Sequence, residues 1–317
     1  MSSKPTRVGV SNRTFDTCGA AALPPHIELV SLADEPSATD VEVVWRRQWD
    51  STAWAVQLLD RLPSLRWLHT DTAGVDRLPL ARLAEMNVRL SNARGAHTPA
   101  VAEWALGALL LTARSLDKTA LDSAERRWVV HQDDLLLRGR TVMVLGLGDI
   151  GRYLAALCNA LGMRVVGVSR SGKAIHGVEV VEAAGSWRDL LPEATFLVNC
   201  LPLTPDTEGI VDRAVLTRLG SPGWLINVGR GQTVVETDLI AALRMRTLSG
   251  AVLDTVVQEP LPAESELWNC PGLLVSPHAS AFTETTERRT RELFLTELGR
   301  HREGAEPANL IDLQRGY

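Results

Sequence analysis

Three side chains in the last third of the chain have the types and the order to do chemistry together. Arg230 lies in "INVGRG", Glu259 in "LDTVVQEPLP" and His278 in "SPHAS", and each stretch includes or follows a short apolar run. An arginine fork can clamp a carboxylate or polarise the adjacent carbonyl. A histidinium can deliver a proton to a carbonyl oxygen, and a glutamate can keep it oriented and charged. Taken singly, each is better explained as a surface or capping residue, but in this order, after strands and downstream of a glycine-rich turn, they fit hydride transfer at a keto acid.

Hydride transfer needs a dinucleotide, and a glycine-rich turn precedes these residues. In "TVMVLGLGDIGRYLAALCNALGMRVVGVSR" the pattern Gly146-x-Gly148-x-x-Gly151 follows a strand, opens a helix and has a second strand at the expected distance. The backbone amides at the start of that helix, around Asp149 and Ile150, face an anion. The turn therefore predicts a pyrophosphate-binding site.

The second strand ends without the acidic residue that usually binds the adenosine ribose. Ser169, Arg170 and Ser171 stand there instead, and they can donate hydrogen bonds to a 2′-phosphate that an acid would repel. This favours NADP(H) as the cofactor. NAD(H) stays open as the alternative, because one arginine on a loop is not a complete phosphate pocket.

The elements that must position these residues alternate along the chain. Six short apolar runs between about residues 140 and 280 are separated by segments that suit helices, and five similar runs occupy the first 95 residues. Thr98-Pro99 predicts the start of a long helix, and residues 283–302 have helical spacing. The pattern predicts an α/β protein of two doubly wound (Rossmann/flavodoxin-like) domains with a cleft between them. The NAD(P)-binding domain, residues 98–282, would be inserted into a substrate-binding domain of residues 1–97 and 283–317.

The composition excludes several other classes of protein. Hydrophobic residues make up 45% and charged residues 22%, and 33 Lys and Arg are mixed with 38 Asp and Glu. No basic stripe indicates nucleic-acid binding, no apolar run is long enough to span a membrane, and four scattered cysteines predict no metal site. We expect a cytoplasmic protein.

The sequence resembles the D-isomer-specific 2-hydroxyacid dehydrogenases over essentially its whole length. "LRGRTVMVLGLGDIGR", "LPLTPDT", "INVGRG", "LDTVVQEPLP" and "SPHAS" are similar to the successive signatures of that family, and "GAHTPAVAEWALGALLLTAR" to its interdomain helix. The resemblance implies that Arg230, Glu259 and His278 are catalytic, with Arg230 and His278 also touching substrate. It also implies further substrate contacts at Ala73, Gly74 and Val75. It places the following residues along the cofactor: Thr98, Leu201, Pro202, Thr207, Val228, Gly229, Asp254 and Ser280.

Within the family the chain looks most like the glyoxylate/hydroxypyruvate reductases, with a Ser-Arg pair after the second strand and Trp45 in "VVW". Trp45 either closes the substrate pocket or is simply packed. "DTVV" departs from the more usual "DVF", which leaves the choice of substrate open. The resemblance implies reversible NAD(P)H-dependent reduction of a small 2-keto acid and a homodimer formed through the interdomain helix and residues 116–137. Two alternatives stay open: an NAD-dependent D-3-phosphoglycerate or D-lactate type dehydrogenase, and a non-catalytic, dinucleotide-sensing protein similar to the corepressors of the family.

Overall fold

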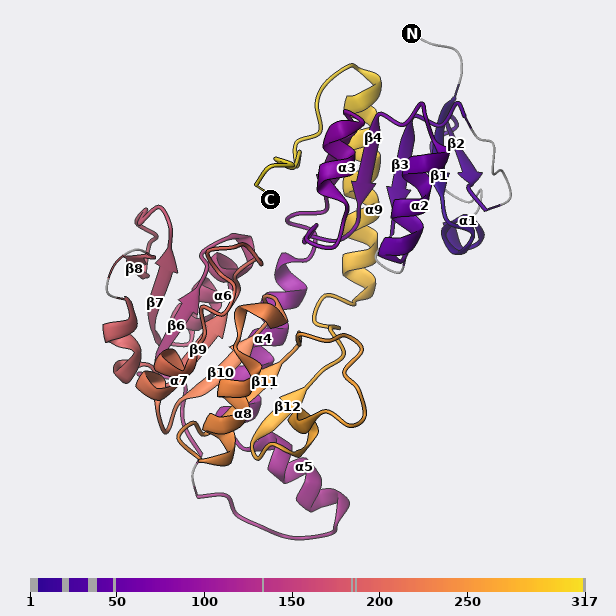
Figure 1. Ribbon diagram of the computed structural model, residues 1–317. Helices are drawn as coiled ribbons and strands as arrows, with labels where there is room; N and C mark the ends of the chain where they lie inside the picture. Colours follow the sequence, from indigo (N-terminus) through magenta and orange to yellow (C-terminus); the bar gives the residue numbers. More distant parts are fainter. Residues whose placement is uncertain are drawn as a thin grey trace. The chain divides into compact units, whose positions relative to one another are not determined.

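A computed structural model describes residues 5–18, 23–33, 39–47, 50–132, 134–183, 185 and 187–315. The chain divides into two compact units, Met1–His97 with Glu284–Tyr317 and Thr98–Thr283 (Figure 1). Both units are α/β, as the alternation of apolar runs and helical segments predicts. That the first unit binds substrate remains a prediction.

Unit 1 is built, within its described residues, on a five-stranded parallel sheet of order β2-β1-β3-β4-β5. Its strands are β1 Thr6–Val10, β2 Ile27–Ser31, β3 Val43–Arg46, β4 Trp67–Thr70 and β5 Arg89–Asn92. Its helices are α1 Asn12–Cys18, α2 Thr52–Arg61, α3 Leu80–Glu85 and α9 Glu284–Arg302.

The two faces of this sheet are covered by different helices. Leu58 and Leu59 of α2 and Leu83 of α3 belong to one apolar core, and Phe294 and Leu298 of α9 belong to the other. Figure 1 shows α2 and α3 on the opposite side of the strands from α9. Residues 284–302 therefore complete the core of a unit whose other elements come from the start of the chain.

Unit 2 contains, among its described residues, a seven-stranded parallel sheet of order β12-β11-β10-β9-β6-β7-β8. Its strands are β6 Thr141–Leu145, β7 Arg164–Ser169, β8 Glu179–Glu182, β9 Phe196–Asn199, β10 Trp224–Asn227, β11 Gly250–Leu253 and β12 Leu273–Val275. Its α-helices are α4 Thr98–Ala113, α5 Leu116–Ala124, α6 Asp149–Ala160, α7 Arg213–Leu219 and α8 Glu236–Arg244, with 3-10 turns at Trp187–Glu193, Gly231–Thr233 and Glu266–Asn269.

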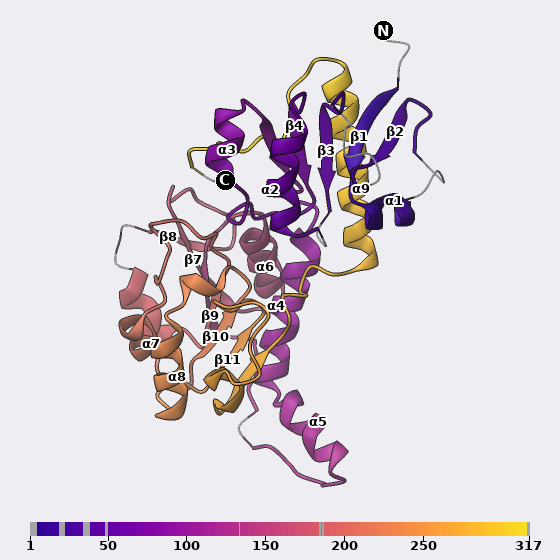
Figure 2. The ribbon, with the colours of Figure 1, turned by 45° about the vertical axis from the view of Figure 1, so that its right-hand side comes forward.

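Alternate residues of the central strands enter two cores. Val142 and Val144 of β6 pack with α4 and α6, whereas Met143 and Leu145 pack with α7 and α8. The two views in Figures 1 and 2 show these helix pairs on opposite faces of the sheet. A strand buried on both sides explains why "TVMVL" is continuously apolar rather than alternating.

The six strands expected in unit 2 are all present, and the doubly wound α/β fold is confirmed. The sheet also has β8, whose short sequence "EVVE" is too polar to be recognised as a strand. Among the described residues, no helix combines the length and the apolar character that a membrane-spanning segment needs.

Candidate active site

The predicted site residues of unit 2 follow successive strands at one edge of its sheet. Gly146 follows β6, Ser169 ends β7, Leu201 lies two residues beyond β9 and Arg230 three beyond β10. The other two residues predicted to be catalytic, Glu259 and His278, follow β11 and β12. Since all pairings are parallel, these loops emerge together at the carboxyl edge, where doubly wound sheets bind ligands.

The glycine turn lies where the strand order reverses, between β6 and β9. Gly146 has φ of 93°, a conformation that favours glycine, and its amide donates to the Val168 carbonyl at 3.0 Å. A Cβ on Gly151 would lie 1.9 Å from the Gly146 carbonyl oxygen, so this position also requires glycine. At Gly148, the N-cap of α6, a Cβ would meet nothing within 4 Å. This open approach to the first amides of α6 fits a pyrophosphate.

The residues beyond β7 are arranged to donate hydrogen bonds. The Ser169 and Ser171 hydroxyl oxygens are 3.4 Å apart, and Arg170 between them is exposed. Hydroxyl and guanidinium groups on an exposed turn suit a phosphate better than they suit a neutral ribose hydroxyl.

Arg230 lies on a turn that leaves its backbone little freedom. A Cβ on Gly231 would lie 2.0 Å from the Val256 carbonyl carbon, so the turn packs directly on the next loop. Nη1 of Arg230 donates to the Gly229 carbonyl at 3.0 Å, and the side chain is partly buried. The backbone that carries the Arg230 guanidinium is therefore held in place.

Glu259 and His278 form the pair that the sequence predicts. His278 Nδ1 lies 3.0 Å from Glu259 Oε2, and the amide of Val256 donates to Glu259 Oε1 at 3.3 Å. The glutamate side chain is 16% exposed and the histidine side chain 40%. With Nδ1 bound to the carboxylate, Nε2 is the ring nitrogen that remains for a substrate.

The His278 loop is held by Asp254, a carboxylate that is 1% exposed. Asp254 Oδ1 accepts hydrogen bonds from the Ser276 hydroxyl at 2.5 Å and the Ala279 amide at 2.8 Å, and the Ser280 amide and hydroxyl also donate to this carboxylate. These donors flank His278, whose φ of 52° lies in the left-handed region. Asp254 and Ser280 were predicted to contact the cofactor, and in this structure their side chains bind each other.

The residues predicted to follow the cofactor after β9 form a compact turn. Thr207 Oγ1 donates to the Pro202 carbonyl at 2.6 Å and accepts from the Thr204 amide at 2.8 Å. Leu201 lies beside the glycine turn, because a Cβ on Gly146 would be 3.1 Å from its Cδ2. Val228, 8% exposed, follows β10, and Thr98 begins α4.

Trp45, in unit 1, is packed in an apolar core. The side chain is fully buried, its Nε1 donates to Asp71 Oδ1 at 2.7 Å, and its ring stacks on Phe294 with centroids 4.3 Å apart. This packing favours the alternative of a packed indole over that of a residue that closes the substrate pocket. The reason is that β3 is covered by α9, which the sequence places more than 200 residues away.

The loop with Ala73, Gly74 and Val75 points its carbonyl groups toward side chains of its own unit. Asn92 Nδ2 donates to the Ala73 carbonyl at 2.6 Å, and Thr72 Oγ1 donates to the Gly74 carbonyl at 2.8 Å. In a trans peptide the amide points opposite to the carbonyl, so the amides of Gly74 and Val75 face away from these side chains. Such amides suit a carboxylate.

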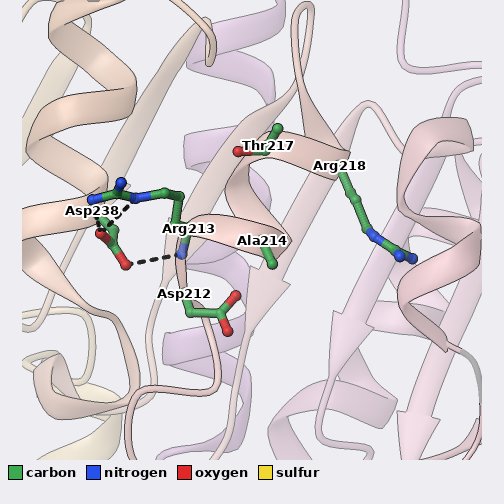
Figure 3. A pocket seen from close by; sticks show the side chains of 6 residues that line it. All are labelled: Asp212, Arg213, Ala214, Thr217, Arg218 and Asp238. Carbon is green, nitrogen blue, oxygen red and sulfur yellow. Dashed lines mark hydrogen bonds and ion pairs between the residues drawn. The ribbon is translucent and has the colours of Figure 1, made fainter.

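Three other features of the described part of unit 2 do not coincide with the predicted site. Burial raises the pKa of the Cys158 thiol to about 12, so this thiol stays protonated. No cluster of three or more potential metal ligands occurs among the residues that the structure describes. A surface hollow on α7 and α8, shown in Figure 3, contains none of the predicted site residues, and its Arg213 is paired with Asp238 at 3.0 Å.

Comparison with known proteins agrees with this geometry. The model of the "D-isomer specific 2-hydroxyacid dehydrogenase, NAD binding domain" matches residues 106–280. A glyoxylate/hydroxypyruvate reductase A of Arabidopsis thaliana is 32% identical over 250 residues, 78% of this chain and 79% of the relative. Among solved structures, a family member from Aeromonas salmonicida has a TM-score of 0.86 at 31% identity, with 98% of this chain and 100% of that chain covered.

A second solved structure is the NADPH-dependent glyoxylate/hydroxypyruvate reductase of Sinorhizobium meliloti in complex with NADP and sulfate. It has a TM-score of 0.85 at 29% identity and covers 98% of this chain and 100% of that chain. The predicted resemblance is confirmed. The chain belongs to the D-isomer specific 2-hydroxyacid dehydrogenase family and is an oxidoreductase that uses NAD(P).

Proposed function

We propose that this enzyme reduces glyoxylate to glycolate or hydroxypyruvate to D-glycerate, a D-2-hydroxy acid, with NADPH as its preferred cofactor. The observation that carries the proposal is the pair formed by His278 Nδ1 and Glu259 Oε2, which are 3.0 Å apart. Glu259 follows β11, and the Arg230 turn follows β10, the neighbouring strand of the sheet. The reductases among its relatives support the choice of substrate. The same reductase relatives favour an enzyme over the non-catalytic alternative.

Each of the three residues has its own task in this proposal. Arg230 binds the substrate carboxylate and polarises the keto group with its planar fork. His278, protonated and held through Nδ1 by Glu259, gives the proton on Nε2 to the keto oxygen. The bound nicotinamide supplies the hydride for the carbonyl carbon. The keto acid gains one hydride and one proton, and it leaves as the hydroxy acid.

The groups on the substrate loop and beyond β7 complete the proposal. The amides of Gly74 and Val75 bind the carboxylate of the small acid, and Arg170 with Ser169 and Ser171 binds the 2′-phosphate. The amides at the start of α6 hold the pyrophosphate.

The decisive experiment measures oxidation of NADPH and NADH with glyoxylate, hydroxypyruvate, pyruvate and phosphohydroxypyruvate. We expect the highest kcat/KM for NADPH with glyoxylate or hydroxypyruvate, and a loss of about 10²- to 10⁴-fold in His278→Ala. Faster turnover of phosphohydroxypyruvate or pyruvate with NADH would favour the phosphoglycerate or lactate alternative.

Cofactor preference is tested with Arg170→Ala. Loss of a charge-assisted hydrogen bond of about 1.5–3 kcal/mol raises the KM for NADPH by roughly 10- to 100-fold and leaves that for NADH unchanged. The matched control is Arg140→Ala, an exposed arginine at the amino end of β6. Equal effects of Arg170→Ala on both cofactors would contradict a role in phosphate binding.

The proposal includes a homodimer formed through the interdomain helix α4 and through the segment of residues 116–137, which begins with α5. Figure 1 shows this segment extending from the rest of unit 2. Leu121 is 64% exposed and Trp128 is 99% exposed, which is unusual for large apolar side chains on a protein surface. Light scattering after size-exclusion chromatography tests the homodimer. We expect the mass of a dimer for the wild type and a smaller mass for Trp128→Asp. A monomeric wild type would refute the dimer.

A further inference from the structure

Two asparagine side chains are buried in the core of unit 2 at the carboxyl ends of adjacent strands. Asn199 ends β9, Asn227 ends β10, and the two residues are direct partners in the sheet. Both are 0% exposed. An amide buried without partners is costly, and a leucine would fill the space at lower cost, so the hydrogen bonds of these asparagines identify their role.

Asn199 connects to a turn of the chain more than 30 residues later. Its Nδ2 donates to Asn227 Oδ1 at 2.9 Å and to Thr233 Oγ1 at 2.6 Å, while its Oδ1 accepts from the Leu201 amide at 3.2 Å. Both hydrogens of the amide group are therefore used. Thr233 is likewise 0% exposed.

The chain of side chains ends on the main chain of Arg230. The Thr233 hydroxyl and amide both donate to the Arg230 carbonyl, and Asn227 Nδ2 approaches the same oxygen at 3.3 Å. Asn227 Oδ1 also accepts from the Gly229 amide at 3.1 Å. The backbone is thus fixed on both sides of the arginine by buried polar groups.

In the other direction, the same chain reaches the loop of the histidine. Asn227 Nδ2 lies 3.2 Å from Thr255 Oγ1 and 3.4 Å from the Thr255 carbonyl oxygen. Thr255 follows Asp254, which accepts from the amides of Ala279 and Ser280 beside His278. Thr255 occupies the position at which "DTVV" departs from the more usual "DVF".

We propose that Asn199, Asn227 and Thr233 are positioning residues that set Arg230 for the substrate, with Thr255 extending their hydrogen-bonded chain to the histidine loop. The inference rests on the proposed function, because it assigns the carboxylate-binding role to Arg230. A guanidinium on a long side chain amplifies small changes at its backbone. A displacement of about 1 Å at such a group lowers the rate by roughly 10²-fold.

The main test replaces Thr233 by valine, which has the same shape and no hydroxyl. Thr233→Val removes the hydroxyl that donates to the Arg230 carbonyl and accepts from Asn199, and leaves the Thr233 amide bond in place. Thr233→Ser keeps this hydroxyl. The matched control is Thr112→Val in α4, where a buried hydroxyl donates to the Ala108 carbonyl at 2.9 Å within one helix.

Steady-state kinetics with a 2-keto acid and NADPH, thermal unfolding and NADPH binding by fluorescence are measured for all variants. For Thr233→Val we expect kcat/KM for the keto acid to fall about 10- to 100-fold, mostly through KM, with unchanged affinity for NADPH. Thr233→Ser should recover most of the activity. Thr112→Val should lose stability to a similar degree but keep its kinetics.

Thr255→Val is the second variant, and it serves if Thr233→Val fails to fold. It removes one contact of Asn227 and should lower kcat/KM less than Thr233→Val. If the wild type is active and Thr233→Val has the same kinetics, the inference is overturned and the proposed function is left intact. If Thr233→Val does not fold, unchanged kinetics of Thr255→Val lead to the same conclusion.

Hydrogen exchange of the 228–233 backbone provides a measurement that does not depend on turnover. We expect faster exchange in this segment in Thr233→Val than in the wild type, and no change there in Thr112→Val. A wild type without turnover would refute the proposed function, and the exchange would still decide whether these residues hold the Arg230 turn. Unchanged exchange in Thr233→Val would overturn the inference.

Discussion

His69 makes the stability of unit 1 depend strongly on pH. It lies on β4 between Trp45 of β3 and Ser91 of β5, and it is 0% exposed. Its Nδ1 is 2.8 Å from Ser91 Oγ, whereas Nε2 has no hydrogen-bond partner among the described residues. A protonated ring would place an uncompensated cation in an aromatic core, so burial lowers the pKa of His69 from 6.5 to about 3.

The sign and size of the effect follow from the difference between the pKa of His69 in the folded protein and its pKa in the unfolded protein. Because the folded pKa lies below the unfolded one, His69 contributes stability that is present above pH 6.5 and is lost as the pH falls toward 3. Each unit of pKa difference corresponds to about 1.4 kcal/mol. Lowering the pH to about 4.5, two units below the unfolded pKa, therefore removes about 3 kcal/mol through this one residue.

Urea unfolding of the wild type and His69→Leu at about pH 7.5 and about pH 4.5 measures the effect. The fit must allow the two units to unfold separately, since two-state behaviour is not assured for a chain with two units. Between about pH 7.5 and about pH 4.5, the free energy of unfolding of the wild type should fall by about 3 kcal/mol more than that of His69→Leu. His176→Asn, at an exposed site of unit 2, should behave as the wild type. Equal losses in the wild type and His69→Leu would refute the reasoning.

Three further predictions concern single groups. Glu259→Gln should lower kcat by about 10²- to 10⁴-fold with little change in NADPH affinity, measured by steady-state kinetics and fluorescence; a change below about twofold would contradict its role in orienting the histidine. Arg47→Met should destabilise the protein by about 3–5 kcal/mol, because Asp71, 1% exposed, loses its ion pair. Adding Asp71→Asn should recover part of this loss in urea unfolding, and additive losses would speak against the pair. The Cys158 thiol, buried and with its pKa raised to about 12, should react with a disulfide reagent only after unfolding; rapid reaction of the native thiol would show that it is accessible.

Much of the fold could be predicted because its signals are local. Strands such as "TVMVL" are buried on both faces and therefore continuously apolar, and Thr98-Pro99 marks the start of α4. The proximity of Glu259 and His278 could be predicted for a related reason: in a parallel sheet, residues that follow neighbouring strands lie at one edge. The strand order itself was not predicted from the sequence, because it depends on pairings between strands that are distant along the chain.

The features that were hard to predict have a common physical cause: they depend on contacts with residues that are distant in the sequence. Trp45 lies on an apolar strand, which suits either a pocket or a core, and its stacking on Phe294 favours the core. Strand β8 is short and lies at the edge of its sheet, where little burial is required. The asparagine pair left a weak signal: a polar residue ends an otherwise apolar strand in "TFLVNC" and "GWLINV".

That signal has a general physical reason in unit 2. The residues that end or directly follow β9, β10 and β11 include Asn199, Asn227 and Asp254, all of them polar and nearly inaccessible to solvent. Each accepts hydrogen bonds from amides of loops beyond the strands, which apolar side chains cannot do. His278 shows why such bonds are needed: at φ of 52° a non-glycine residue costs about 1–3 kcal/mol and persists only where its surroundings hold it. Buried polar residues at strand ends thus reduce the apolar core, but they fix the backbone that carries Arg230 and His278. Their substitution should therefore impair catalysis more than it impairs folding.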